Sequence, residues 1–258
     1  MTAIHPTAII HPEADLDSSV RVGPYCIIGA GVKIGKGTEL LSHVVMEGPT
    51  EIGSNCRFFP FCSIGHVPQD LKFHGEHTEL KIGDNNVFRE SVTVHRGTLG
   101  GGAITKLGND NFIMAYSHIA HDCIIGNQVI LANASTLAGH VTIHDRSTVG
   151  AFSGIHQFCR IGTHAFIGGY SVITKDVLPY SKTVGNRAVC YGTNPVGLRR
   201  RGFSEETIAA IKHAFRLLLQ SKLNTSQAID AIEKEANQVP EVKLLVEFIR
   251  QSKRGIIK

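Results

Sequence analysis

Large apolar side chains return at every sixth residue over most of this chain. The run that begins at Ile4 holds eleven consecutive sixth positions and ends at Ile64. The same phase returns for three positions from Ile82, and after a shift of one residue twelve more run from Leu107 to Ile173. A helix repeats near 3.6 residues and a half-buried strand repeats at 2, so a period of six matches neither element alone. It predicts one short strand and one corner in each repeat.

Small side chains give a second signal, four residues after these apolar positions. Three repeats make one coil of a triangular solenoid, in which the apolar positions fill the interior and the small residue lies where the coil is tightest. Five of the six cysteines occupy this small position: Cys26, Cys56, Cys62, Cys123 and Cys159. The cysteines include no C-x-x-C pair and no zinc-ligand spacing, so we interpret them as core residues rather than reactive thiols.

The repeat is interrupted twice, at residues 66–81 and 98–106. We predict that both segments are loops that leave the solenoid, and loops on a rigid scaffold often carry function. The solenoid is predicted to span residues 1–190, and a small C-terminal helical domain is predicted to span residues 191–258. The expected fold class is therefore mainly β.

The pattern of apolar residues becomes helical beyond about residue 195. Ser204 is a predicted N-cap, with Glu205 and Glu206 in the first turn of its helix. A second helix is expected after the turn at residues 224–226, and Pro240 suits the first turn of a third helix that ends near residue 253. The apolar face of the first helix is predicted to consist of Ile208, Ile211, Phe215, Leu218 and Leu219.

Histidines are frequent, with 14 in the chain, and several fall close together in the repeat. Residues eighteen apart in such a solenoid stack on one face at the spacing of neighbouring strands, about 4.8 Å. His121 is then expected above Gly139, with Gln157 below it, and Asp122 above His140. Polar side chains predicted to gather on this outer face are those of His118, His121, Asp122, His140 and His156.

This grouping suits an acyl transfer to a hydroxyl group. A neutral imidazole such as that of His121 can remove the hydroxyl proton in the transition state. The neighbouring Asp122 carboxylate would fix the tautomer and stabilise the imidazolium. A backbone N–H that no side chain covers, such as that of Gly139, can stabilise the tetrahedral oxyanion. Direct transfer of this kind needs no serine or cysteine nucleophile.

Charge and hydropathy limit the other functional classes. The net charge is only +4 and no nucleic-acid-binding module is recognisable, so we do not expect the chain to bind nucleic acid. The N-terminus lacks a basic region followed by an apolar stretch, and no apolar run is long enough to span a bilayer. The expected protein is not membrane-embedded, and its expected location is cytoplasmic.

Several motifs resemble those of a known enzyme family over nearly the whole chain. They are Pro68–Lys72, Arg89–Gly97, His118–Cys123, Leu137–Val141, His156–Cys159 and Arg200–Ser204. Together they resemble the UDP-N-acetylglucosamine 3-O-acyltransferases, which begin lipid A biosynthesis in Gram-negative bacteria. The hexapeptide repeat alone would indicate only the wider superfamily. The resemblance implies that the solenoid is a left-handed parallel β-helix.

The resemblance also implies an activity. The enzyme would transfer an (R)-3-hydroxyacyl group from acyl carrier protein to the 3-hydroxyl of UDP-N-acetylglucosamine, without a metal or an organic cofactor. It would be a homotrimer with active sites between neighbouring prisms. His121 would be the general base, Asp122 its partner and the Gly139 amide the oxyanion donor.

Further residues acquire roles through the same resemblance. Residues implied around the sugar, diphosphate and acyl chain are Asp70, Lys72, His95, His118, His140, His156 and Gln157. Asn194, Arg200 and Arg201 would hold nucleotide phosphates or the phosphopantetheine of the carrier. Gly169 would end a groove that runs along the prism from His121, about 13 Å away, which predicts acyl chains of about twelve to fourteen carbons. Two positions depart from the family pattern, Arg187 and Val196.

Three alternatives stay open from the sequence. Some relatives acylate a UDP-sugar that carries an amino group at C3 in place of the hydroxyl. A γ-class carbonic anhydrase shares the prism but binds zinc through histidines of two subunits. Flat β-helix faces also serve as ice-binding or packing surfaces, but these show regular threonine ladders rather than a cluster of histidines.

Overall fold

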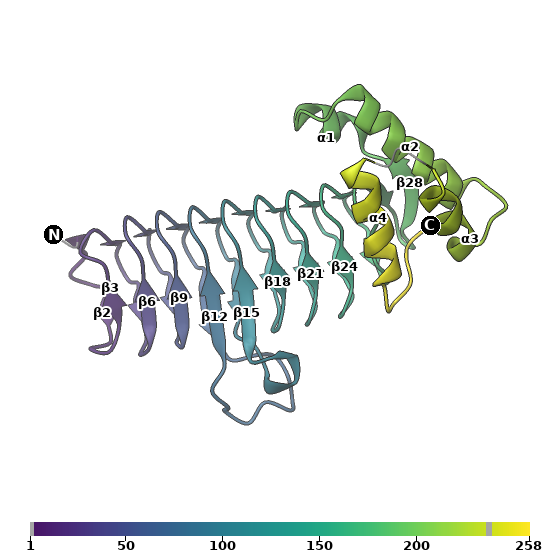
Figure 1. Ribbon diagram of the computed structural model, residues 1–258. Helices are drawn as coiled ribbons and strands as arrows, with labels where there is room; N and C mark the ends of the chain where they lie inside the picture. Colours follow the sequence, from purple (N-terminus) through teal and green to yellow (C-terminus); the bar gives the residue numbers. More distant parts are fainter. Residues whose placement is uncertain (1–2, 236–238) are drawn as a thin grey trace.

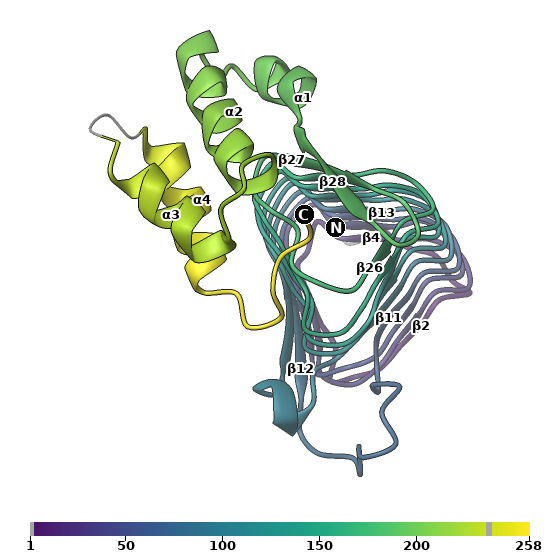
Figure 2. The same ribbon diagram turned by 90° about the vertical axis from the view of Figure 1, so that its right-hand side faces the viewer.

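The computed structural model describes residues 3–235 and 239–258, and most of them form a long prism (Figure 1). Three parallel sheets make its sides, and the view along the prism shows the nearly triangular cross-section (Figure 2). We call them sheets A, B and C, in the order in which the chain meets them in each coil. The predicted fold class, a left-handed parallel β-helix with a small helical C-terminal part, is confirmed.

Short strands stack along each sheet. Sheet A contains β1 (Ala3–Ile4), β4 (Arg21–Val22), β7 (Glu39–Leu40), β10 (Arg57–Phe58), β13 (Val87–Phe88), β16 (Phe112–Ile113), β19 (Ile130–Leu131), β22 (Thr148–Val149), β25 (Phe166–Ile167), β27 (Ser181–Val184) and β28 (Val189–Thr193). Sheet B contains β2 (Ile9–Ile10), β5 (Ile27–Ile28), β8 (Val45–Met46), β11 (Ser63–His66), β14 (Thr93–His95), β17 (His118–Ile119), β20 (Thr136–Leu137), β23 (Gly154–Ile155) and β26 (Val172–Ile173). Sheet C contains β3 (Asp15–Leu16), β6 (Val32–Ile34), β9 (Thr50–Ile52), β12 (Glu79–Ile82), β15 (Ile104–Leu107), β18 (Ile124–Ile125), β21 (Thr142–Ile143) and β24 (Arg160–Ile161).

The register of these strands follows the six-residue repeat. Ile119 pairs with Leu137, and Ile125 pairs with Ile143, so each coil of this region takes eighteen residues. The apolar residue of each repeat points inward, and the rings of Phe58 and Phe88 stack in the core with centroids 4.7 Å apart. Burial of these side chains is the main stabilising term of the prism.

The cysteines are core residues, as predicted. All six are buried and none forms a disulfide. Burial raises the pKa of the Cys62 thiol, and that of the Cys123 thiol, to about 12, because a thiolate would lose its hydration there. Neither thiol is a nucleophile at neutral pH.

Both interruptions of the repeat leave the prism at the junction between sheets B and C (Figure 1). They are shorter than the sequence predicts, since the excursions occupy only residues 67–78 and 96–103. The last residues of each predicted loop belong to strands of sheet C instead, where Glu79 pairs with Ile104. The second excursion contains a turn of 3-10 helix, η1 (Leu99–Gly101).

Helices follow the prism, as predicted from residue 195 onward. They are α1 (Pro195–Arg200), α2 (Glu205–Leu219), α3 (Thr225–Glu233) and α4 (Pro240–Arg250). The Ser204 side chain accepts the N–H of Thr207, so the predicted N-cap is confirmed. Helix α3 begins at Thr225, inside the segment predicted as a turn, and Asn224 and Gln227 form its capping box. The antiparallel hairpin of β27 and β28 was not predicted, and β28 runs across residue 190.

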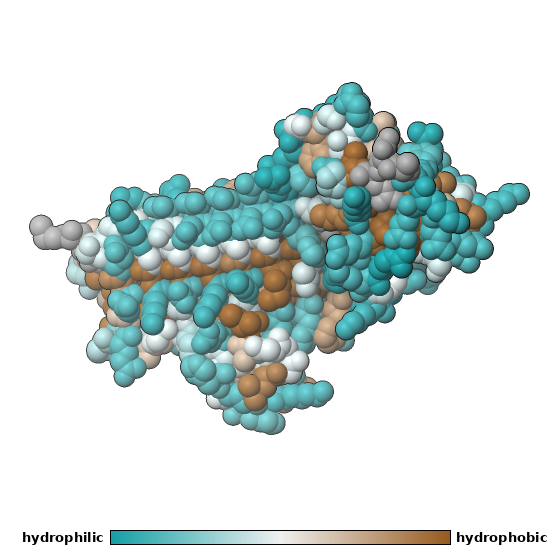
Figure 3. Space-filling view, viewed as in Figure 1, coloured by the Kyte–Doolittle hydropathy of each residue, from teal (hydrophilic) through white to brown (hydrophobic). Residues whose placement is uncertain are grey.

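The C-terminal segment returns to the end of the prism. Ile256 bridges to Asp176 in parallel fashion, and the buried Ile257 side chain covers the core there. Helix α4 lies beside β24, where the Arg160 guanidinium lies 4.3 Å from the centroid of the Phe248 ring (Figure 1). On the side shown in Figure 3, polar side chains run in rows along the prism on both sides of a narrow apolar line. Among the described residues, the structure contains no helix with the length and apolar character needed to cross a membrane.

Candidate active site

The predicted stacking of His121 on Gly139 is confirmed, and it occurs at one corner of the prism. We call the turns that join sheet B to sheet C corner BC, those from A to B corner AB, and those from C to A corner CA. At corner BC the N–H of His140 donates to the carbonyl of His121, and the N–H of Phe158 donates to that of Gly139. This ladder places His121, Gly139 and Gln157 in successive coils.

Asp122 holds the His121 ring. Its Oδ2 lies 2.7 Å from His121 Nδ1 and 3.7 Å from His140 Nε2, and its side chain is completely buried. An ionised carboxylate only accepts hydrogen bonds, so the hydrogen of His121 is on Nδ1 and the lone pair of Nε2 is free. His121, with 15% of its side chain exposed, can therefore present a basic nitrogen to a ligand at the surface.

Residues of the second excursion, together with Thr105 on β15, complete the environment of Asp122. The N–H of Thr98 donates to Oδ1 at 2.8 Å and its hydroxyl donates to Oδ2 at 2.7 Å, while the Thr105 hydroxyl accepts the N–H of Asp122 at 2.8 Å. A β-carbon at Gly101 would lie 2.0 Å from Asp122 Cγ, so only glycine fits. The sequence did not predict these contacts, which fix the carboxylate and through it the imidazole.

Gly139 leaves room for the His121 ring. A β-carbon at this position would lie 2.6 Å from His121 Cε1 and 2.8 Å from Nε2. Among the described residues the Gly139 N–H has no hydrogen-bond acceptor. The free nitrogen of His121 and a free backbone donor are therefore neighbours, which is the geometry that a base and an oxyanion donor require.

Two more histidines lie beside this pair on sheet B. His118 lies on strand β17, where its side chain points outward next to the inward-pointing Ile119. Its Nδ1 is 2.7 Å from the Thr93 hydroxyl, and its ring meets that of the buried His95 edge to face. Burial lowers the pKa of His118, and burial together with the charge of His118 lowers that of His95 to about 4. Both are neutral near pH 7.

The other predicted residues at corner BC are also present. His140 stacks on Phe158 with ring centroids 4.3 Å apart. Burial lowers the pKa of His140, whereas the negative charge of Asp122 and, more weakly, that of Asp70 raise it. Asp70 and Lys72 lie on the first excursion, where the Lys72 N–H donates to Asp70 Oδ1. His156 and Gln157 are exposed at this corner, one coil below Gly139. His66, which the sequence analysis did not single out, pairs in register with His95 between the neighbouring strands β11 and β14.

Three predicted residues lie near another corner of the same chain. The Arg201 guanidinium is 3.5 Å from Gln128 Oε1 at corner CA, next to Arg200 at the end of α1. The N–H of Asn194 donates to the carbonyl of Tyr180, whose own N–H donates to Thr163 at the same corner. Within one chain, sheet C therefore separates these residues from His121.

Gly169 lies at corner AB, on the far side of sheet B from His121. His121 and Gly169 are 48 residues apart in the sequence. This separation is two full coils of eighteen residues plus twelve further residues, so Gly169 lies at a different corner from His121. Within one chain His121 and Gly169 therefore lie at different corners, and the groove expected along the prism between them stays a prediction. The rings of Phe152 and Tyr170 also lie at corner AB, where they stack with centroids 5.1 Å apart and remain exposed.

The carboxylate and the two imidazoles of this cluster also lie close enough together to bind one metal ion. His121, Asp122 and His140 offer ligand atoms within 4.8 Å of one another. Asp122 Oδ2 already accepts from Thr98 and His121, and Oδ1 accepts from Thr98. A carboxylate engaged in this way orients an imidazole and has little capacity left for a cation.

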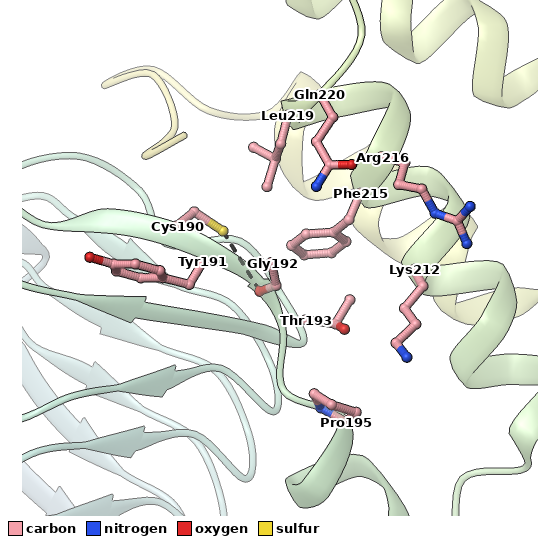
Figure 4. Close-up of a pocket in the computed structure, with 10 residues that line it drawn as sticks. All are labelled: Cys190, Tyr191, Gly192, Thr193, Pro195, Lys212, Phe215, Arg216, Leu219 and Gln220. Carbon is pink, nitrogen blue, oxygen red and sulfur yellow. Dashed lines mark hydrogen bonds between the residues drawn. The ribbon is translucent and has the colours of Figure 1, made fainter.

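A cavity of about 660 Å³ lies away from this cluster, between β28 and α2 (Figure 4). Lys212 and Arg216 line it from successive turns of α2, above an apolar floor that includes Phe215. No histidine of corner BC takes part. The cavity has the charge of an anion-binding surface but no acid–base group for acyl transfer.

A hexapeptide-repeat prism with an imidazole–carboxylate pair at one corner defines the class of hexapeptide acyltransferases. Residues 104–139 and 140–175 match the bacterial transferase hexapeptide family, and residues 176–257 match the second domain of the UDP-N-acetylglucosamine O-acyltransferases. The acyl-[acyl-carrier-protein]–UDP-N-acetylglucosamine O-acyltransferase of Thermodesulfovibrio yellowstonii is 55% identical over all 258 residues, and the match covers 100% of both chains. This chain belongs to the family of UDP-N-acetylglucosamine O-acyltransferases.

Solved structures agree with this assignment. LpxA of Acinetobacter baumannii superimposes with a TM-score of 0.96 and 50% identity, over 99% of each chain. The UDP-N-acetylglucosamine acyltransferase of Arabidopsis superimposes with a TM-score of 0.88 and 36% identity, over 99% of this chain and 100% of that one. The similarity therefore includes the C-terminal helices as well as the prism.

Proposed function

We propose that this enzyme transfers an (R)-3-hydroxyacyl group from acyl carrier protein to the 3-hydroxyl of UDP-N-acetylglucosamine, the first step of lipid A biosynthesis, with His121 as general base. The observation that carries the role of His121 is its 2.7 Å contact with the buried Asp122 carboxylate, directly above Gly139. Membership of the O-acyltransferase family supports the reaction. The proposal places the enzyme in the cytoplasm together with its carrier protein.

The reaction is a direct transfer. His121 Nε2 removes the proton of the sugar hydroxyl as its oxygen attacks the thioester carbonyl. The Gly139 N–H donates to the oxyanion of the tetrahedral intermediate, and Asp122 stabilises the imidazolium. Collapse breaks the carbon–sulfur bond, and His121 returns the proton to the thiolate of the carrier. These steps require neither a metal nor an organic cofactor.

The sugar and its diphosphate lie, in this proposal, against the polar groups of corner BC. Asp70 and Lys72 on the first excursion, with His140, flank the acceptor sugar. His95 and His118 are neutral neighbours that act as hydrogen-bonding partners, since burial lowers both pKa values. His156 and Gln157, exposed one coil further, lie where the substrate would continue along the prism.

A homotrimer with active sites between neighbouring chains explains why predicted site residues lie at different corners of a single chain. Arg200, Arg201 and Asn194 lie near corner CA, and Gly169 lies at corner AB. A second copy can bring these corners to the first copy's His121, and the outer face of sheet B offers the exposed Ile9 and Ile27 for contact. The interface remains part of the proposal.

One assay tests the proposed reaction. Purified enzyme is mixed with (R)-3-hydroxyacyl carrier protein and UDP-N-acetylglucosamine, and the acylated sugar nucleotide is detected by mass spectrometry. The expected product carries an ester at C3. Turnover of only the corresponding 3-amino UDP-sugar, with formation of an amide, would contradict the choice of acceptor.

The acyl chain length is expected to depend on Gly169. A threefold axis parallel to the prism keeps each residue at its level, so the axial distance of about 13 Å from His121 holds when Gly169 comes from a neighbouring copy. Gly169→Met should shift the preferred chain from about twelve to fourteen carbons toward about ten, since each methylene left unburied costs about 0.8 kcal/mol. Competition between donors of different length measures the shift, and an unchanged profile would place the end of the groove elsewhere.

The carrier protein is expected to meet the C-terminal third of the chain. Residues 176–258 contain 14 of the 26 Lys and Arg residues but only 8 of the 22 acidic ones, so this part suits an acidic partner. Arg199 is paired with Glu205, whereas Arg200 has no ion pair among the described residues. Arg200→Glu should raise the KM for one substrate at least about threefold, and added salt should weaken wild-type activity.

Lys36→Glu is the matched control for this charge reversal, because Lys36 is an exposed cation near the other end of the prism. It should leave both KM values unchanged. Should Arg200→Glu and Arg201→Glu also leave both values unchanged, these arginines have no part in binding either substrate.

A further inference from the structure

The turn between α1 and α2 presents Arg200 and Arg201, which the proposed function brings to the active site of a neighbouring copy. Helix α1 has only six residues, and the two arginines lie at its C-terminal end. An isolated helix of this length is not stable in water, because too few hydrogen bonds compensate for its nucleation. The place of both arginine side chains is therefore set by the contacts that hold α1 on the prism.

A Schellman motif ends α1. The N–H of Phe203 donates to the carbonyl of Leu198 at 3.2 Å, and the N–H of Gly202 donates to that of Arg199 at 3.0 Å. Gly202 has a φ of +81°, in the left-handed region that favours glycine. The motif reverses the chain directly after Arg201, so Phe203 is the first residue beyond the arginines that can contact the prism.

The half-buried Phe203 ring lies against corner CA. It meets the His164 ring edge to face with centroids 4.9 Å apart, and it meets the Tyr180 ring in the same manner at 6.0 Å. His164 and Tyr180 are 9% and 2% exposed, so Phe203 packs on a buried surface, which we call the aromatic platform. Burial, together with the charges of Arg146 and Arg201, lowers the pKa of His164 to about 4, so the platform is neutral near pH 7.

One column of corner CA continues from the platform. The backbone ladder places in successive coils Gln128, Arg146, His164 and Tyr180. Gln128 Oε1 lies 3.2 Å from Arg146 Nε and 3.5 Å from a guanidinium nitrogen of Arg201. Phe203 thus packs on the last two residues of the column, and Arg201 extends to the first. The course of the Arg201 side chain depends on both contacts.

The N-terminal end of α1 is held separately. Asn194 Oδ1 accepts the N–H of Gly197 at 3.1 Å and so caps the helix, and the N–H of Asn194 donates to the Tyr180 carbonyl at 2.8 Å. A β-carbon at Gly197 would lie 2.3 Å from Asn194 Nδ2, so the cap leaves no space for a side chain there. None of these contacts involves the Phe203 ring. Loss of that ring therefore loosens the end of α1 that carries the arginines, and not the end that carries Asn194.

We propose that Phe203 is a positioning residue for binding of the acceptor. Its ring, packed on the aromatic platform, holds the end of α1 so that Arg200 and Arg201 meet the nucleotide phosphates in the active site of a neighbouring copy. This inference rests on the proposed function and adds to it a residue that does not itself touch the substrate. Recognition of a phosphate by a guanidinium depends on direction as well as charge, so a displaced helix end weakens binding even though both arginines remain.

The first test compares Phe203→Ala with the wild type, both as full-length enzymes. The KM for UDP-N-acetylglucosamine should rise about tenfold, while kcat and the KM for the acyl carrier protein stay within about twofold, because the catalytic groups of corner BC are untouched. Calorimetry with UDP should show the same loss of about tenfold, which corresponds to about 1.4 kcal/mol. Phe203→Tyr keeps the ring and should bind UDP within about twofold of the wild type.

Phe248→Ala is the matched control, because Phe248 fastens another helix, α4, to the prism in the same way. Its ring meets that of His144 edge to face with centroids 5.7 Å apart. Phe248 is only 4% exposed, so its removal should lower the Tm at least as much as Phe203→Ala, yet the Kd for UDP should stay within about twofold. If Phe248→Ala does not fold, Phe203→Leu and Phe248→Leu form the pair, with a loss of at least about threefold expected only for the first.

A double-mutant cycle distinguishes positioning of the arginines from a general loosening of the C-terminal part. Its readout is kcat/KM for UDP-N-acetylglucosamine. In a background that carries Arg200→Ala and Arg201→Ala, the further change Phe203→Ala should lower kcat/KM less than about twofold, because no guanidinium remains to be positioned. A purely structural role would give about the same loss in both backgrounds.

Several outcomes overturn the inference. Unchanged binding of UDP by Phe203→Ala would do so, as would equal losses in Phe203→Ala and Phe248→Ala or an undiminished effect in the background without the arginines. A rise in the KM for the acyl carrier protein alone would assign the turn to the donor instead. Failure of the proposed function is distinguishable, because the wild type itself would then form no acylated sugar, whatever residue occupies position 203.

Discussion

Replacing His121 by alanine is expected to lower kcat about a thousandfold while the fold is retained. General-base catalysis contributes about 10² to 10⁴ in rate, and no other imidazole at corner BC is held by a buried carboxylate at 2.7 Å. The side chain lies outside the core, so its removal creates no internal cavity. Steady-state rates measure the loss, and circular dichroism with size-exclusion chromatography checks the fold and the assembly.

His11→Ala is the matched control, because His11 is an exposed histidine at corner BC several coils away. It should retain full activity. A His121 variant that keeps a tenth of the wild-type rate would contradict the assignment of the base.

Gly139→Ala is expected to reduce kcat at least about a hundredfold. The new methyl group would lie 2.6 Å from His121 Cε1, so the imidazole must leave its position over the Gly139 backbone. A displaced base and a covered N–H donor both lose transition-state stabilisation, and one lost oxyanion donor alone costs about 10² to 10³ in kcat. The backbone itself is not strained by alanine, because Gly139 is not in the left-handed region.

Gly154→Ala provides the control for this substitution. Gly154 lies on β23, and a β-carbon there would meet no atom of its own chain within 4 Å. The two variants thus add the same methyl group to the same prism, one against the His121 ring and one that contacts no other residue of its chain. Equal activities of the two variants would mean that the position of His121 over Gly139 is not required for turnover.

Much of the fold could be predicted because it repeats. Each apolar anchor from Ile4 to Ile173 carries the same information as the one before it, so the strands and their eighteen-residue register follow from counting. The helix caps at Ser204 and Asn224 were predictable from local chemistry. The β27–β28 hairpin was not, since it breaks the period and pairs antiparallel over a short stretch.

Counting along the repeat predicted only the part of the candidate site that follows the eighteen-residue coil, whereas Asp70 and Lys72 came from the resemblance to a known family. His121, Gly139 and Gln157 lie one coil apart and were found by arithmetic. Thr98 and Gly101 were missed, because the excursion that brings them to Asp122 follows no period. The position of Gly169 at another corner was already contained in the 48-residue separation, which is not a multiple of eighteen. Which chain supplies Gly169 to a given active site depends on how the chains associate and not on the eighteen-residue repeat.

The eighteen-residue coil also bears on how such a chain folds. Parallel sheets usually fold slowly, because distant segments must meet before any pairing compensates for the entropy of the closed loop. Here strand partners such as Ile119 and Leu137 are only eighteen residues apart, which is about 0.07 of the chain length and comparable to the contact order of helical bundles. Each coil needs only the coil beside it, so ordering can start at any point and spread along the axis. This enzyme therefore combines the hydrogen bonding of a large parallel sheet with the sequence locality of an all-helical protein.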